Sequence, residues 1–99
     1  MPYPHEHSCR LVDPGEFDRF IRKHVQDNND MGSYKATGKA YDLIIGYRKD
    51  GSTDVQAHRY PTDTWTEAQA RAHCRAHSGK SFEGAMTGAI REAAGRSRG

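Results

Sequence analysis

Histidine and cysteine side chains gather in two short stretches of this chain. One set lies near the start and the other lies within one alanine-rich segment: His5, His7 and Cys9, and His73, Cys74 and His77. These residue types bind zinc, and His73 and His77, four residues apart, would share one side of a helix. His73 and Cys74 are adjacent, however, and would point about 100° apart. Neither set has Cys-x-x-Cys spacing, so the pattern leaves metal binding open but favours a structural role.

Catalysis by Cys74 is the second chemistry to consider. A nucleophilic cysteine needs a base within reach and a third group that orients this base. Cys74 instead lies among alanines typical of a buried helix face, where its thiolate is disfavoured. The sequence also lacks a glycine-rich phosphate loop, a nucleophile elbow and a paired-carboxylate motif. We therefore predict a non-enzymatic protein without metal or cofactor, with Cys9 and Cys74 as reduced thiols.

A helix is expected to begin at Asp13. Asp13 can cap it, Pro14 suits its first turn, and Glu16 favours the helix dipole. Apolar residues then recur at helical spacing and form one stripe: Phe17, Phe20, Ile21, His24 and Val25. The stripe predicts a core helix that ends before Asn28.

Two alternating runs flank Asp50-Gly51 and predict an antiparallel hairpin of residues 41–48 and 52–60. A two-residue turn would place Ile45 opposite Gln56. A three-residue loop with Gly51 in the left-handed conformation would place Ile45 opposite Val55 and Leu43 opposite Ala57. We prefer the second register because it gathers the apolar residues on one face, with Tyr41, Leu43, Ile45 and Tyr47 beside Val55 and Ala57.

A second helix is expected after Trp65. Thr66 and Gln69 fit a capping box, although a start two residues earlier, at Thr64, fits as well. Gly79 lies where a left-handed C-cap belongs, and Phe82 follows on a short third strand or extended segment.

These elements predict an α+β fold with one domain at residues 13–85. In this domain the helix expected after Asp13 and the helix expected after Trp65 pack against the antiparallel hairpin. An N-terminal arm at 1–12, disordered or laid against the body as a strand, precedes it, and a frayed helix or disordered basic tail at 86–99 follows. The expected core comprises Phe17, Phe20, Ile21, Leu43, Ile45, Val55, Ala70, Cys74 and Phe82, with Trp65 at the helix entrance. His73 and His77 are expected at the margin of this core.

Net charge is only +2, which is weak for a nucleic-acid-binding face. No apolar run is long enough for a membrane span and no signal segment opens the chain, so we expect a soluble, cytoplasmic protein, or one associated with a virion. The loop at residues 27–39 is long for this domain and forms the expected adaptable surface. The residues that we predict to bind a protein partner lie there and on the exposed side of the second helix: Asp30, Tyr34, Lys35, Arg71 and Arg75.

Three blocks of the chain resemble a small domain of tailed-bacteriophage proteins from the head and packaging gene neighbourhood. The blocks are PYPHEHSCRLVDPGEFDRF, YDLIIGYRKDGSTDVQAHRYP and WTEAQARAHCRAHSGKSFEGA, which cover most of residues 2–85. This family has no established activity, so the resemblance assigns no catalytic residue. It implies a phage or prophage origin, in a bacterial host. Together with the missing active-site motifs and the compact α+β core, it leads us to predict a protein-binding module that is accessory to a phage component. An anti-CRISPR-like inhibitor of a host defence complex and a nucleic-acid-binding accessory protein are the alternatives.

Overall fold

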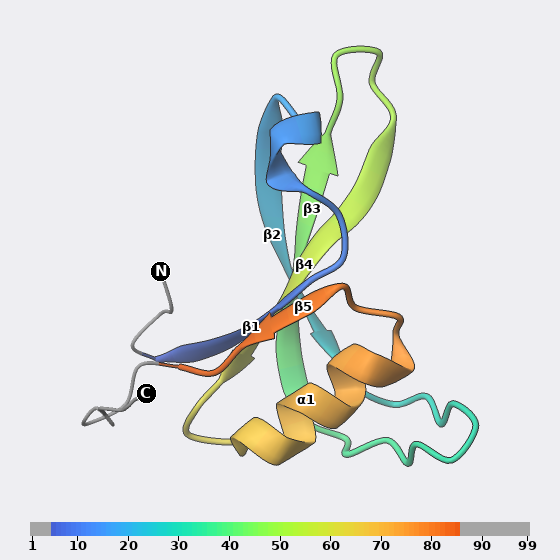
Figure 1. Cartoon of the computed structure of the whole chain (residues 1–99), viewed down its shortest axis with the longest axis vertical. Helices are drawn as coiled ribbons and strands as arrows, with labels where there is room; N and C mark the ends of the chain where they lie inside the picture. The colour runs from blue at the N-terminus through green and yellow to red at the C-terminus, as the bar shows by residue number, and fades with distance from the viewer. Residues whose placement is uncertain (1–4, 86–99) are drawn as a thin grey trace.

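The computed structural model describes residues 5–85, which form a five-stranded antiparallel sheet and one α-helix (Figure 1). The elements in chain order are β1 (Glu6–Arg10), the 3-10 turn η1 (Pro14–Glu16), β2 (Arg19–Gln26), β3 (Ala40–Tyr47), β4 (Thr53–Pro61), α1 (Glu67–Ala76) and β5 (Ser81–Glu83). The strand order is β2-β3-β4-β1-β5. The predicted architecture of two helices packed on a hairpin is therefore wrong. The tail expected at 86–99 lies outside the described residues.

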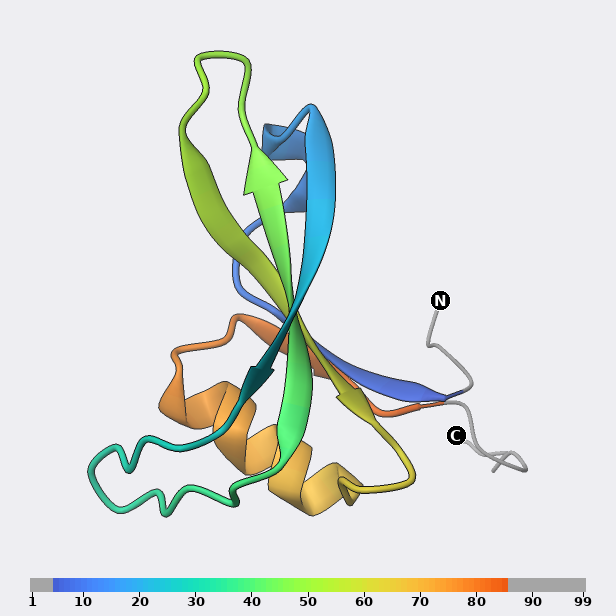
Figure 2. The same ribbon diagram turned by 180° about the vertical axis from the view of Figure 1, so that it is seen from behind.

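The sheet is strongly twisted, and α1 covers only part of one face. Seen from either side, β2, β3 and β4 extend well past the helix (Figures 1 and 2). The loop that joins β2 to β3 lies beside α1 at the same end of the molecule, where the Lys39 ammonium donates to the Gln69 side chain at 2.7 Å. One end of the sheet is thus covered by α1, and the other end extends beyond this helix.

The predicted first helix is a short turn followed by a strand. Asp13 does act as a cap, since its carboxylate accepts from the Gly15 N–H at 2.9 Å, but only one 3-10 turn follows. Phe17 is already extended, and residues 19–26 pair with β3 in unbroken register. The apolar spacing fits a helix, but phenylalanine, isoleucine and valine also favour strands, and pairing along all eight residues of β2 decides between the two.

The N-terminal segment is a strand within the sheet, which was one of the two alternatives. β1 pairs with β4 on one side and with β5 on the other, both antiparallel. The short strand expected around Phe82 is β5, and Phe82 lies opposite Cys9. Residues near the start of the chain therefore hold the last described strand in place.

The hairpin register is confirmed near its loop and shifts further along. Ile45 lies opposite Val55, and Gly51 has a φ of +89° in a three-residue loop closed by the Arg48 N–H, which donates to the Ser52 carbonyl. Leu43, however, lies opposite His58 and not Ala57, because a β-bulge occurs between Ile44 and Ile45. Ala57 consequently faces the other side of the sheet, opposite Ile44.

The second predicted helix is present as α1, and its capping box is formed by Thr66 and Gln69. The C-cap prediction is wrong, because Ser78 adopts the left-handed conformation and Gly79 does not. Gly79 is required for another reason. A Cβ there would lie 2.3 Å from Cys74 Sγ and 2.5 Å from Cys9 Sγ, so only glycine fits against these sulfurs.

The core differs from the predicted one. Phe17, Ala70 and Cys74 are buried as expected, whereas Leu43, Ile45, Val55 and Phe82 are half-buried. Phe20 and Ile21 are 44% and 40% exposed, so their assignment to the core is wrong. Aromatic and polar side chains between the sheet and α1 fill the space instead: Tyr41, His58, Tyr60, Trp65 and His73.

Candidate functional site

The strand register divides the side chains between two faces of the sheet. Tyr41, Tyr60 and Cys9 lie on the face that packs against α1. The alternate residues point to the opposite face, where no described α-helix covers the strands, and we call it the helix-free face. Two rows of side chains cross it from β2 to β5: Arg22, Ile44, Ala57, Arg10 and Ser81, and next to them His24, Asp42, Arg59, Ser8 and Glu83.

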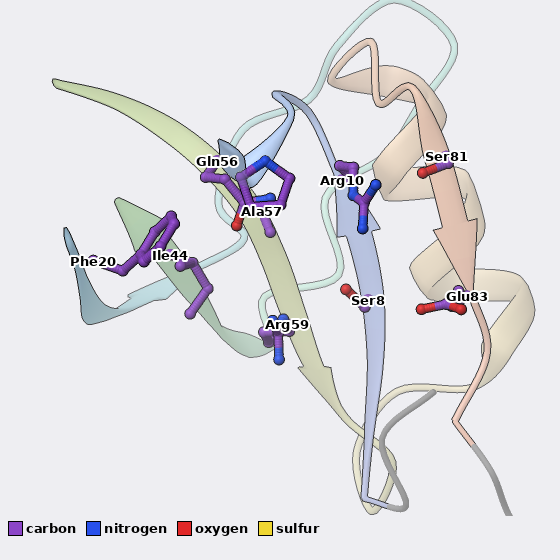
Figure 3. A pocket seen from close by; sticks show the side chains of 10 residues that line it. Ser8, Arg10, Phe20, Ile44, Gln56, Ala57, Arg59, Ser81 and Glu83 are labelled. Carbon is purple, nitrogen blue, oxygen red and sulfur yellow. The ribbon is translucent and has the colours of Figure 1, made fainter. Parts of the chain in front are cut away.

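A hollow of about 610 Å³ lies on the helix-free face. All five strands and η1 contribute to its lining, which consists of Ser8, Arg10, Pro14, Phe20, Ile44, Gln56, Ala57, Arg59, Ser81 and Glu83. Figure 3 shows Ser8 and Arg10 on the middle strand of this region, with β4 on one side and β5 on the other. Its volume is in the range of ligand-binding clefts, and its lining joins apolar side chains to hydroxyl and charged groups.

A close contact shapes one end of this face. Phe17, just after η1, lies directly on Gly46 of β3, where an added Cβ would be 2.3 Å from the Phe17 ring. The Phe17 ring also meets the edge of the Phe20 ring, with centroids 5.8 Å apart. Gly46 thus lets the segment from Pro14 to Phe17 lie flat on the sheet beside the hollow.

Most charges on the helix-free face are paired with one another. The Arg22 guanidinium donates to Glu6 and to Asp42, both at 2.7 Å, and Asp42 also pairs with the His24 ring. Arg59 lies 3.7 Å from Glu6. This balance of cations and carboxylates lacks the basic excess of a nucleic-acid-binding face.

Arg10 and Glu83 differ from these paired groups. Both are exposed and line the hollow, and within residues 5–85 neither side chain has an ion-pair partner. A binding partner could therefore contact one cation and one carboxylate here without first breaking an ion pair. The apolar surface of Phe20 and Ile44 lies in the same hollow.

The opposite face buries a chain of polar groups beneath α1. The Tyr60 hydroxyl lies 2.7 Å from His73 Nδ1 and 3.2 Å from His58 Nδ1. His73 Nε2 lies 3.6 Å from the Asp27 carboxylate, which accepts from the Tyr34 hydroxyl at 2.6 Å. His73 is fully buried, so its predicted place at the margin is wrong, while His77 is half-buried and stacks on it.

Burial sets the protonation of this cluster. Desolvation, with repulsion from the neighbouring imidazoles, lowers the pKa of His58 to about 3 and that of His73 to about 4. Burial alone would raise the pKa of Asp27, but hydrogen bonds from Thr37 and Tyr34 outweigh it and lower that pKa. At neutral pH the cluster therefore holds neutral imidazoles beside one carboxylate. Because it is enclosed, we assign it to the core and not to a binding surface.

Cys9 and Cys74 form a disulfide, so the expectation of two reduced thiols is wrong. The bond joins β1 to α1 across 65 residues of sequence, and both cysteines are buried. Nor do residues 5–85 contain a group of three or more histidine, cysteine or acidic side chains placed to hold a metal ion.

The predicted partner-binding arginines lie on the outer side of α1. Arg71 and Arg75 are both exposed. The Arg71 guanidinium donates to Glu67 at 2.8 Å, one turn earlier, and lies 4.6 Å from the centre of the Phe82 ring.

The predicted loop residues have different surroundings. Asp30 accepts from the Ala36 N–H at 2.8 Å and lies 3.9 Å from the Lys35 ammonium, both at the exposed end of the loop. Tyr34 points inward to Asp27, so it stabilises the loop and is only half-exposed. The loop is thus organised around a buried carboxylate. Asp30, Lys35, Arg71 and Arg75 form an alternative contact surface, distinct from the hollow.

The residues that line the hollow were not singled out from the sequence. One signal was present in β1, where His7 and Cys9 are buried and Ser8 and Arg10 alternate with them. Such alternation is typical of a strand with one covered face. The neighbours of Arg10 in space come from β4 and β5, far along the chain, and no local pattern indicates that pairing.

Comparison with known proteins finds no matching family model, no matching curated protein and no matching solved structure. The resemblance to the phage domain therefore stays a hypothesis. Among residues 5–85, no helix has the length and apolar character needed to cross a membrane.

Proposed function

We propose that this chain is a non-enzymatic protein-binding module whose contact surface is the helix-free face of the sheet. The observation that carries the proposal is the hollow of about 610 Å³, to which all five strands contribute side chains. A partner side chain placed there would meet the apolar surfaces of Phe20 and Ile44. At the same time it would meet the charges of Arg10 and Glu83, which have no ion-pair partner among residues 5–85 and which favour specific contacts at the rim of an interface.

The resemblance to phage domains supports a phage component as the partner, and a host defence complex is the competing proposal. Affinity capture with mass spectrometry from phage-infected and uninfected host cells distinguishes them, because a phage component is present only in the infected cells. A host nuclease complex captured from both preparations would favour the inhibitor.

The contact surface is tested by two single substitutions in the hollow and by a double substitution on α1 as the control. Ser81→Trp fills the hollow and Arg10→Glu reverses its cation, and both residues are exposed, so folding should be retained. We expect either change to abolish capture of the partner, while Arg71→Glu with Arg75→Glu on α1 leaves it intact. The reverse pattern would move the interface to the helix and the loop at 27–39, and would refute this proposal.

A further inference from the structure

The outer edge of β2 has no strand partner among the residues that the structure describes. β2 forms one edge of the sheet and pairs only with β3. Seven of its eight residues are exposed, Val25 alone being half-buried. No residue between His5 and Ala85 pairs with this outer edge. An edge strand of this length can accept a further strand.

The register of β2 with β3 identifies which backbone groups of β2 can bond to a further strand. The Asp27 N–H donates to the Lys39 carbonyl at 2.9 Å, one position beyond the pair of Gln26 with Ala40. Backbone groups of successive residues in an antiparallel strand alternate between its two sides. The odd-numbered residues of β2 therefore bond to β3, and the N–H and C=O groups of the even-numbered residues, Phe20, Arg22, His24 and Gln26, point outward.

The side chains along this edge carry positive charge. β2 contains Arg19, Arg22 and Lys23 and no acidic residue. Arg22 is held by Glu6 and Asp42 on the helix-free face. Arg19 and Lys23 lie on the other face with Ile21 between them, and within residues 5–85 neither has a carboxylate partner. The edge thus presents a cation, an exposed apolar side chain and a second cation at alternate positions.

We infer that the outer edge of β2 binds an extended acidic segment of a partner protein as a sixth strand. The segment has the pattern acidic-x-apolar-x-acidic, so that its carboxylates lie opposite Arg19 and Lys23 and its apolar residue lies opposite Ile21. This pattern reads the same in both directions, so it suits a parallel or an antiparallel strand. The inference rests on the proposed function in one respect, namely that the partner is a protein.

Charge excludes two other occupants of the edge. Two copies of the chain paired through β2 would bring Arg19, Arg22 and Lys23 of one copy against the same cations of the other, which is destabilising. Residues 86–99 contain three arginines and one glutamate, so the sequence of this segment is not the acidic one required. An acidic segment from a different protein complements the edge.

The test uses the full chain and a synthetic probe peptide, acetyl-Ser-Glu-Thr-Val-Thr-Glu-Ser-amide, with a control in which lysine replaces both glutamates. We expect the acidic peptide to slow amide hydrogen exchange at Phe20, Arg22 and His24, three of the four residues of β2 whose N–H groups point outward, and the lysine peptide to leave them unchanged. Binding should weaken as salt is added, because exposed charges are screened.

Charge reversal gives the matched control. Arg19→Glu with Lys23→Glu should lower the affinity for the acidic peptide at least about tenfold and allow the lysine peptide to bind. Lys49→Glu at the exposed hairpin loop should change the affinity for neither peptide. The inference would be overturned by any of three results: equal binding of both peptides, slowed amide hydrogen exchange elsewhere in the chain and not at β2, or a dimer joined through β2. Such a failure leaves the proposed function untouched, because that is tested at Arg10 on β1 and Ser81 on β5.

Discussion

Gly46 is the residue on which the end of the helix-free face depends. A Cβ at this position would lie 2.3 Å from the Phe17 ring, so Gly46→Ala must displace the buried phenylalanine or push β3 away from it. We expect the free energy of unfolding to fall by about 1–3 kcal/mol, the usual cost of overpacking. Urea denaturation measures this change. Gly15→Ala is the control, since its Cβ would make only an ordinary contact at 3.4 Å and its effect should be close to zero.

The buried imidazoles predict how stability depends on pH. In the folded chain the pKa values of His58 and His73 are about 3 and about 4, below the value of about 6.5 in an unfolded chain. As pH falls below about 6.5, the unfolded chain binds protons first, and the free energy of unfolding decreases. By pH 5 the loss should be about 2 kcal/mol for each ring. Asp27, whose pKa is lowered, loses its own stabilising contribution at still lower pH.

Denaturant unfolding at pH 7 and pH 5 measures this loss. His58→Leu removes one buried imidazole and should reduce the difference between the two pH values by about half. His5→Gln removes an exposed ring outside the cluster and should leave the difference as in the original chain. Equal stability at pH 7 and pH 5 would show that the cluster is protonated or open in the folded state.

At the scale of elements, the start of α1 can be assigned by substitution. The Thr66 hydroxyl accepts from the Gln69 N–H at 3.1 Å, and the Gln69 side chain accepts from the Thr66 N–H at 3.0 Å. Thr66→Ala should cost about 1 kcal/mol, as is typical of a lost N-cap. Thr64→Ala tests the alternative start two residues earlier and should have almost no effect. Thermal unfolding compares the stability of the two variants. A larger loss of stability for Thr64→Ala would show that Thr64, and not Thr66, is the N-cap.

Local chemistry determined which elements could be predicted. The capping box, the hairpin loop at Gly51 and the pairing of Ile45 with Val55 depend on residues close in sequence, and they were predicted correctly. The stripe from Phe17 to Val25 was mistaken for a helix because its spacing suits both a helix and a strand. Only pairing with β3 decides between them, and that pairing is a tertiary contact. The hollow was missed for the same reason, since its lining depends on strand order.

At the scale of the whole molecule, the Cys9–Cys74 disulfide ties the first strand to the helix. It closes a loop of 65 residues, which by chain-entropy arguments stabilises the fold by about 4 kcal/mol. Cys9→Ala with Cys74→Ala should lower the unfolding midpoint and leave the chain close to its stability limit. The original chain measured with and without a thiol reductant is the control. An unchanged midpoint in both experiments would mean that the disulfide makes no net contribution to the stability of the fold.

The place of β1 in the sheet also bears on how the chain is made. Synthesis proceeds from the N-terminus, so β1 leaves the ribosome before either of its neighbours, β4 and β5. Its two edges stay without partners until residues 53–61 and then residues 81–83 have emerged. Such long-range pairing delays folding and exposes unpaired strand edges to other chains meanwhile. A product that stops before Ser81 would keep one edge of β1 open permanently, and aggregation is its expected fate.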